Sequence, residues 1–392
     1  MISLLTIIVL FASASSPSAQ AASPGGLDWL IDPLHDDPAG IPGWVQMNTS
    51  GFGNPANFGL TVLFEFKHRL YAGTVNGDIG GSIWRSADGS SWEPVSEPGF
   101  GADFGSANAA IIAMVKYKGH LYVGVGWGDG AGQIWRSLDG SNWEQVEGNG
   151  FGDMNNNSVS AFIVHNRYLY AATGNAANGF QIWRSQTGDP SSWTNVVTDG
   201  FGDPANDQVT SFIEYKGALY AAVESIVDHG PAQVWRTTGG LHWTAVTIDG
   251  FGDANNFSTG GFASYKNNLY LGAWNDVTGA QLWRSRDGGT WTQVVGDGFG
   301  DLNNIKIESV YEYKGKLYAV AANLVTGLEV WRSSNGTRWQ QVNPDGFGDF
   351  NNTATLWTNA TAVFKDRLFI GAWNSVDGGE IWMMLPGGPS SP

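Results

Sequence analysis

Apolar and polar positions alternate along this chain in short runs that follow one another in a fixed order. In residues 257–295, apolar runs at 257–265, 269–273 and 281–285 precede a fourth at 291–295 that begins with Trp291. Lys-Asn-Asn and Asp-Gly, which favour tight turns, separate these runs. The pattern predicts four short β-strands, A to D, joined by an A–B turn, a B–C loop at 274–279 and a C–D turn.

The same order of runs recurs along the chain. Its clearest marker is Gly-Phe-Gly, which connects strand D to the next strand A at intervals of 48–51 residues. The seven copies begin at Gly51, Gly99, Gly150, Gly200, Gly250, Gly298 and Gly346. Four short strands in a repeat of this length are typical of a propeller blade. We therefore predict an all-β fold, a seven-bladed β-propeller with four-stranded blades.

A second Trp marks the start of strand D, seven residues before Gly-Phe-Gly, as Trp92 and Trp143 illustrate. The seventh copy ends at Trp382 without such a Trp, whereas Trp44 lies seven residues before the first Gly-Phe-Gly. We therefore expect the N-terminal strand to complete the last blade and close the ring. Closure would remove the open sheet edges that promote aggregation. The propeller is predicted to span residues 44–384.

The two ends of the chain are predicted to lie outside the propeller. An apolar run at 4–12 leads to Ala-Gln-Ala at 19–21, so residues 1–22 resemble a secretory signal peptide, although no Lys or Arg precedes the run. The run is too short for a membrane span, which needs about 20 apolar residues. We expect a secreted, extracellular protein with no membrane insertion, an N-terminal linker at 23–43 and a flexible tail at 385–392.

Charge and composition narrow the class of partner. The net charge is −16, only 14% of residues are charged, and cysteine is absent. A strongly acidic chain lacks the basic surface that nucleic acids and anionic membranes require, so neither is an expected partner. Without cysteine there is no disulfide framework and no thiol chemistry.

Loops and turns are expected to divide between two faces of the ring. The A–B and C–D turns share one face, the turn face, and the B–C and D–A loops share the other, the loop face. Outside the strands, every Arg and eight of nine Lys fall in or beside the turns, and only Lys306 approaches the loop face. The loop face is rich in Asp and Asn instead. Because its loops are longer and more varied, we expect the functional surface there.

Three C–D turns read Ser-x-Asp-Gly-x-x-Trp, at 86–92, 137–143 and 285–291. They resemble the Asp-box of sialidase-like propellers, with a spacing one residue shorter, Asn335 in place of Asp in one copy, and no acid at 237–240. In that family the box is a structural turn, so the resemblance implies a fold and no chemistry. A sialidase also needs three arginines around its substrate, which the loop face lacks. The whole pattern is similar to that of secreted bacterial repeat propellers without assigned activity, which implies a non-catalytic protein.

Five of the nineteen Trp do not belong to the repeat, and four of these fall on the loop face. Two are followed by Asn at equivalent places. An aromatic ring beside amide groups is typical of a sugar site, because the ring covers C–H groups and the amides bind hydroxyls. The candidate ligand-binding residues are Trp127, Trp274, Asn275, Trp357, Trp373 and Asn374. The alternative is that these residues pack under neighbouring loops.

An Asp follows Gly-Phe-Gly in five copies, and Asn residues come next in most of them. These candidates are Asp153, Asp203, Asp253, Asp301 and Asp349. One interpretation is that the side chains bond their own backbone in Asx-type turns. The other is calcium held by carboxylate and amide oxygens, although no complete Asp-x-Asp-x-Asp-Gly loop is present. No other cofactor is indicated.

Glu224 and Glu308 depart from the repeat and are candidate catalytic residues, since two facing carboxylates can cleave a glycosidic bond. The sequence thus leaves three functions open. The first is a secreted, non-catalytic propeller that binds carbohydrate or another extracellular ligand on the loop face. The second is a glycoside hydrolase or lyase that acts on polysaccharide at the same face. The third is a platform for an extracellular protein partner.

Overall fold

A computed structural model describes residues 43–101, 108–128, 130–354 and 360–386. This part of the chain consists of short strands and 3-10 turns without an α-helix, so the all-β prediction is confirmed. The predicted signal peptide at 1–22, nearly all of the linker at 23–43, Trp357 and the end of the tail lie outside the described residues. No helix within the described ranges is long and apolar enough to cross a bilayer.

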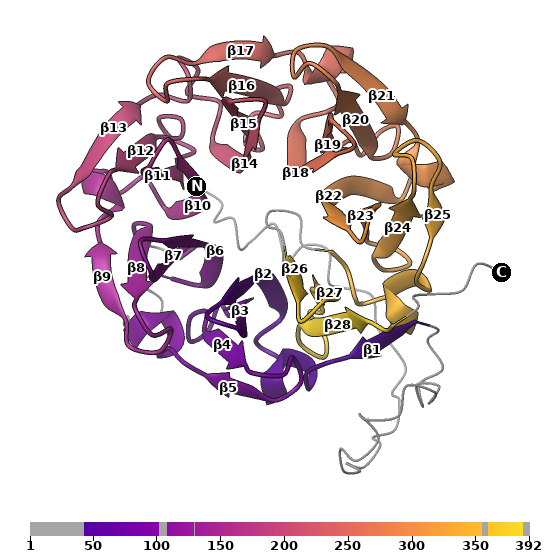
Figure 1. The fold of residues 1–392 in the computed structure, drawn as a ribbon, viewed down its shortest axis with the longest axis horizontal. Helices are drawn as coiled ribbons and strands as arrows, with labels where there is room; N and C mark the ends of the chain where they lie inside the picture. The colour runs from indigo at the N-terminus through magenta and orange to yellow at the C-terminus, as the bar shows by residue number, and fades with distance from the viewer. Residues whose placement is uncertain (1–42, 102–107, 129, 355–359, 387–392) are drawn as a thin grey trace.

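The strands form antiparallel units of four arranged around a common centre, as Figure 1 shows. The innermost strands are β2 (Gly59–Phe66), β6 (Ala110–Tyr117), β10 (Ser158–His165), β14 (Gln208–Tyr215), β18 (Ser258–Tyr265), β22 (Asn304–Tyr313) and β26 (Thr361–Phe364). The second strands are β3 (Arg69–Val75), β7 (His120–Gly126), β11 (Tyr168–Gly174), β15 (Ala218–Glu224), β19 (Asn268–Trp274), β23 (Lys316–Asn323) and β27 (Arg367–Ala372).

The outer half of each unit is shorter. The third strands are β4 (Ile83–Ser86), β8 (Gln133–Ser137), β12 (Ile182–Ser185), β16 (Gln233–Thr237), β20 (Gln281–Ser285), β24 (Glu329–Ser333) and β28 (Glu380–Met384). The outermost strands are β5 (Trp92–Pro94), β9 (Glu144–Glu147), β13 (Trp193–Val197), β17 (Thr244–Thr247), β21 (Trp291–Val295), β25 (Gln340–Gln341) and β1 (Trp44–Gln46). The predicted strands C and D of the fifth copy match β20 and β21 in both bounds. Strand B ends later than predicted, because Trp274 pairs with Ser258 and belongs to β19.

Gly-Phe-Gly segments pack the outer strands together. Six of them begin or lie within 3-10 turns: η1 (Ser50–Gly53), η2 (Pro98–Gly101), η3 (Gly150–Gly152), η4 (Gly250–Gly252), η5 (Gly298–Gly300) and η6 (Asp345–Gly348). In every copy the Phe ring stacks on the third-strand Trp, with ring centroids 4.3–5.0 Å apart. In six copies a buried Asn six residues after the first Gly donates to its carbonyl, as Asn256 does to Gly250 at 2.8 Å; in the second copy Asn108 does so from nine residues away. The repeated Phe, Trp and Asn are therefore structural.

The first strand makes the same contacts as its internal counterparts. β1 pairs antiparallel with β28, with Trp44 opposite Met384. The Trp44 Nε1 donates to the Val342 carbonyl at 2.7 Å, and the Trp143 Nε1 donates to the Val95 carbonyl at 2.7 Å. Trp44 thus occupies the position of an outermost-strand Trp next to the last strand of the chain.

In five copies the glycine of the C–D turn lies against a Tyr of the preceding unit, and in the first copy Gly89 lies against Phe369. Gly240 has a φ of 76°, and a Cβ at this position would overlap the hydroxyl of Tyr170, which is fully buried. We expect Gly240→Ala to lower the free energy of unfolding by about 1–3 kcal/mol, through overpacking and left-handed backbone strain. Chemical denaturation measures this loss. Gly239→Ala is the control, because its Cβ would meet nothing within 4 Å; equal effects of the two substitutions would contradict the account.

Candidate functional site

A group of charged side chains breaks the repeat where β14 and β22 begin and β15 ends. Glu224, Lys306 and Glu308 expose only 1%, 1% and 4% of their surface, and Asp207 exposes 7%. We call these four residues the acid–lysine cluster. Because β14, β18 and β22 are neighbouring inner strands (Figure 1), residues from the fourth and sixth copies meet on the loop face near the centre.

Each member of the cluster replaces an uncharged residue of the repeat. Glu224 corresponds to Val75, Gly126, Gly174, Trp274, Ala322 and Trp373 in the other copies. Lys306 corresponds to Gly59, Ala110, Ser158, Gln208 and Ser258 at the starts of the other inner strands. These positions are fixed by strand pairing, since Glu224 lies opposite Gln208 and Lys306 opposite Trp274. Glu224 and Lys306 therefore stand near strand ends, and Asp207 directly precedes β14.

Glu308 is positioned by a β-bulge. The pairing of β22 with β23 shifts between Ile307 and Ser309, so Glu308 is the extra residue. Comparable shifts occur near the start of other inner strands, as between Val209 and Ser211 of β14. A bulge turns a side chain away from the regular alternation of the strand. Here it brings the carboxylate of Glu308 within 3.4 Å of the Lys306 ammonium.

Hydrogen bonds hold the two other carboxyl groups. Glu224 accepts from the Gln208 amide at 3.0 Å through Oε1 and from the Ser258 hydroxyl through Oε2. Asp207 Oδ2 accepts from the backbone N–H of Val227 at 3.0 Å. A buried carboxyl group needs such partners, because an unpaired one is costly.

Burial dominates the titration of this cluster. It raises the pKa of Glu224 to about 8, against the opposing effect of Lys306, while the negative charge of Asp207 acts in the same direction as burial. Burial also raises the pKa of Asp207 to about 6, although backbone N–H donors oppose it. Glu224 therefore carries a proton at neutral pH, in a state that can donate a hydrogen bond.

Aromatic rings cover one side of the cluster. The Lys306 ammonium lies 5.3 Å from the centroid of Trp274, a cation–π distance. The ring of Phe257 lies 4.8 Å from Trp274, and that of His229 lies 4.7 Å from Phe257. Trp274 is half-buried and His229 is exposed. The row therefore leads from the buried cluster to the surface of the loop face.

Two of the candidate sugar-binding Trp are not open platforms. Trp127 and Trp373 are each 8% exposed and pack edge to face, with ring centroids 6.4 Å apart. Phe58 packs against Trp373 at 5.4 Å, and the Trp373 Nε1 donates to the Leu60 carbonyl at 3.2 Å. Trp373 belongs to the seventh unit, Phe58 to the first and Trp127 to the second, so these rings bury apolar surface where three units meet, which corrects the expectation that they face a ligand.

The two candidate Asn are also fully buried. The amide of Asn275 donates to Asp253 Oδ2 at 2.9 Å and to Asn256 Oδ1 at 3.0 Å, and its carbonyl oxygen accepts from two backbone N–H groups. Asn374 makes the same bonds with Asp349 and Asn352. Their side chains are committed to loop structure, so the interpretation as sugar ligands is replaced by a structural one.

The five Asp after Gly-Phe-Gly all form Asx-type turns. Each accepts, through Oδ1, the backbone N–H two residues later: Asn155, Ala205, Asn255, Asn303 and Asn351 donate to Asp153, Asp203, Asp253, Asp301 and Asp349. Each Asp lies in its own loop. In the part of the chain that the structure describes, no group of three or more His, Cys, Asp or Glu is placed to hold a metal ion.

Exposed apolar side chains gather on the loop face. Of the twelve large ones in the described ranges, ten lie in B–C or D–A loops and two, Leu138 and Leu241, in C–D turns. The ten are Ile79, Met154, Val227, Ile248, Val277, Leu302, Leu324, Val325, Phe350 and Val376. These side chains are spread over most of the copies, and each is exposed on its own loop.

The sequence pattern did not single out Asp207 or Ser258. A signal for Asp207 exists, because the equivalent residues in the other copies are Phe58, Ala109, Asn157, Phe257, Ile305 and Thr353, none of them charged. Comparison of this position across the copies would have placed Asp207 beside Glu224 as a departure from the repeat. Ser258 carries no such signal, since Ser also occupies the position in the third copy.

No protein-family model and no curated protein matches the sequence. Among solved structures, an ancestral GH74 enzyme superposes with a TM-score of 0.56 and 13% identity, over 85% of this chain and 49% of that one. A chain of the mitotic checkpoint complex gives 0.55 and 12%, with 94% and 99% covered. The Trypanosoma rangeli sialidase gives 0.51 and 12%, with 87% and 59% covered. This chain therefore spans about half the length of the GH74 enzyme and 59% of the sialidase chain. At these identities the likeness shows the fold alone, and that fold is a β-propeller.

Proposed function

We propose that this chain is a secreted, non-catalytic propeller of seven blades that binds carbohydrate on its loop face. The pairing of β1 with β28 supports a ring closed by the N-terminal strand. The observation that carries the binding function is that the aromatic side chains of this site are more exposed than its carboxyl groups. Trp274 and His229 reach the surface, whereas Glu224 and Glu308 beneath them are 1% and 4% exposed.

The exposed rim of this site has the chemistry of sugar recognition. Trp274 offers part of an aromatic face for the C–H groups of a pyranose ring, and its position is held by Lys306 below. Asp228 and His229, both exposed on the adjacent B–C loop, supply polar groups for hydroxyls. The acid–lysine cluster supports this rim from below.

Catalysis of glycoside cleavage is the second candidate, and the protonated state of Glu224 favours it. A general acid must hold a proton at the working pH, and the raised pKa of Glu224 meets that requirement. The burial of both carboxyl groups argues against it, because a catalytic carboxyl must reach the bond that is cleaved. A platform for an extracellular protein is the third candidate, supported by the exposed apolar side chains of the same face.

A glycan array, run with calcium and with a chelator, tests the proposed function. We expect wild-type protein to bind one glycan class, and Trp274→Ala to weaken that binding about tenfold or more through the loss of ring stacking. Leu241→Ala is the control, because it removes an exposed apolar side chain from the turn face. Melting temperatures within a few degrees of wild type would establish that the variants are folded.

Two outcomes would replace the proposal. Absence of glycan binding, or equal binding by the Trp274 and Leu241 variants, would favour the protein platform. Release of reducing ends from a bound polysaccharide, lost in Glu224→Gln, would make the protein an enzyme. We expect no such release.

A further inference from the structure

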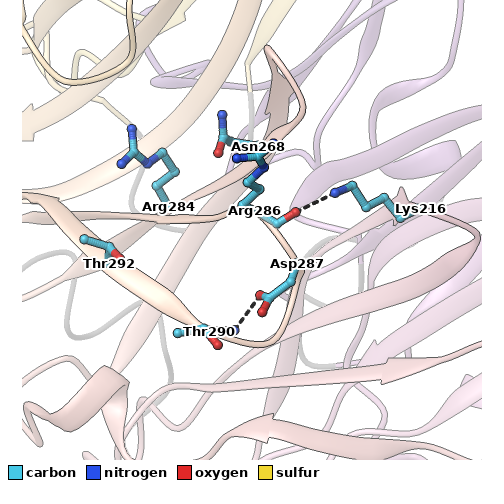
Figure 2. A pocket seen from close by; sticks show the side chains of 7 residues that line it. All are labelled: Lys216, Asn268, Arg284, Arg286, Asp287, Thr290 and Thr292. Atoms are coloured by element: carbon cyan, nitrogen blue, oxygen red, sulfur yellow. Dashed lines mark hydrogen bonds between the residues drawn. The ribbon is translucent and has the colours of Figure 1, made fainter.

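The turn face carries a hollow of about 680 Å³ between the fourth and fifth units. Figure 2 shows Lys216 from the A–B turn after β14 directed toward Arg286 and Asp287 of the C–D turn between β20 and β21. Arg284, Asn268 and Thr292 also line the hollow. It lies on the opposite face from the acid–lysine cluster.

Lys216 makes a hydrogen bond that lysines of other A–B turns also make. The Lys216 ammonium donates to the backbone carbonyl of Arg286 at 2.7 Å (Figure 2). Lys67 and Lys266 make the same contact with the carbonyls of Leu138 and Ser334, at 2.6 and 2.9 Å. The residue that accepts this bond is uncharged in the other copies with a complete turn: Ala87, Leu138, Gln186, Thr238 and Ser334. Only the fifth copy therefore brings a guanidinium group beside the ammonium group.

Arg284 has no carboxylate opposite it on the outermost strand, as is also the case for Arg184, Arg236 and Arg332. In the first two copies the residue opposite on the outermost strand is Glu, and Arg85 pairs with Glu93 at 2.6 Å as Arg136 pairs with Glu144. Opposite Arg284 stands Thr292. Across the described ranges, no carboxylate oxygen lies within 4.0 Å of a side-chain nitrogen of Lys216, Arg284 or Arg286.

Asp287, whose carboxylate is the one among the residues that line the hollow, accepts hydrogen bonds from its own turn. Asp287 Oδ1 accepts from the backbone N–H groups of Gly289 and Thr290 at 2.8 and 2.7 Å and from the Ser285 hydroxyl at 3.0 Å. These donors hold the pKa of Asp287 well below its usual range. Lys216, Arg284 and Arg286 thus line the hollow with a single carboxylate, which is already hydrogen-bonded. The net charge of the whole protein is −16.

We propose that this hollow binds an oxyanion, namely the carboxylate or sulfate group of an acidic polysaccharide. Guanidinium groups bind such groups through two parallel hydrogen bonds, and the Asn268 amide and Thr292 hydroxyl add neutral donors. A polymer fits better than a free ion, because the hollow is open and further lysines of the A–B turns line the same face. This site is independent of the carbohydrate site on the loop face.

Calorimetry tests this proposal. It measures the binding of polygalacturonate, dextran sulfate and neutral dextran to the whole mature protein. We expect one or both acidic polymers to bind with an affinity that falls with salt, and neutral dextran not to bind here. Arg286→Gln should weaken binding about tenfold. Its side chain is exposed and its backbone carbonyl still accepts from Lys216, so the fold is preserved.

Lys266→Gln is the matched control, because it removes one charge from the same face and from the same kind of contact. Its affinity should change less than twofold. Binding of polygalacturonate alone would identify the carboxylate as the ligand, and binding of dextran sulfate alone would identify the sulfate. If neither polymer binds, or if both substitutions weaken binding equally, the proposed site is wrong. Trp274→Ala should leave this binding unchanged, which separates it from the loop-face function.

Discussion

Replacing Trp44 with alanine is expected to lower the free energy of unfolding by about 3–5 kcal/mol, the cost of deleting a buried aromatic side chain. Trp44 is fully buried, its Nε1 donates to the Val342 carbonyl, and its ring meets that of Phe347 edge to face at 5.2 Å. β1 has only three residues, and beyond their pairing with β28 the Trp44 side chain anchors the strand to Val342 and Phe347 of the sixth unit and the loop that follows it. Denaturant unfolding monitored by circular dichroism measures the loss.

Trp143→Ala is the control for this prediction, because Trp143 lies between two units that are consecutive in the sequence. Trp143 makes the same hydrogen bond, to Val95, and its ring meets Phe100 at 5.8 Å, although it is only half-buried. We expect a loss of the same kind and somewhat smaller size. If Trp143→Ala destabilises the protein and Trp44→Ala does not, β1 does not close the ring in solution.

The second large effect is expected at Lys306. Lys306→Met keeps the volume of the side chain and removes the cation among Asp207, Glu224 and Glu308, all of them buried. Breaking a buried ion pair by removing one partner costs about 3–5 kcal/mol, because the other charge stays buried without compensation. We expect a loss of this size at pH 7.5, measured by denaturant unfolding. Lys316→Met, at the exposed start of β23, should change stability by less than about 0.5 kcal/mol.

The pH dependence of stability distinguishes this electrostatic cause from a packing defect. The folded-state pKa of Glu224, about 8, lies above its ordinary value of 4.5, so the folded protein retains a proton that the unfolded chain loses. The stabilisation from this proton is therefore complete below about pH 4.5 and declines as pH rises to 8, by up to about 1.4 kcal/mol per pH unit. Asp207 contributes in the same sense between 3.8 and about 6.

Two variants should alter this profile in opposite directions. Glu224→Gln removes the titrating group, so its stability should decline less between pH 5 and 8 than that of wild type. Lys306→Met should decline more steeply, and its deficit should shrink at pH 5, where the carboxyl groups are protonated. A deficit that is the same at pH 5 and pH 8 would mean that Lys306 acts through packing alone.

Strand positions in this protein follow from local sequence. The third and outermost strands of the fifth copy, Gln281–Ser285 and Trp291–Val295, match the prediction because Asp-Gly separates them and Gly-Phe-Gly follows the second of them. The Asx-type turns at the five Asp were likewise one of two interpretations made from sequence, since each bond links residues two apart. Local preferences of this kind depend on few neighbours.

Only the tertiary structure determined which side chains are buried and which residues of different copies lie together. Asp207 and Glu224 come from the fourth copy and Lys306 from the sixth, so the packing of units brings them together, and no local pattern indicates how deep their side chains lie. Trp127 and Trp373 each follow the end of a second strand, where the sequence predicts a loop, and packing of the two rings against one another and their neighbours buries both. The repeat in the sequence determined the strands and their order. Packing between successive units determined which departures from the repeat became a buried cluster and which remained at the surface.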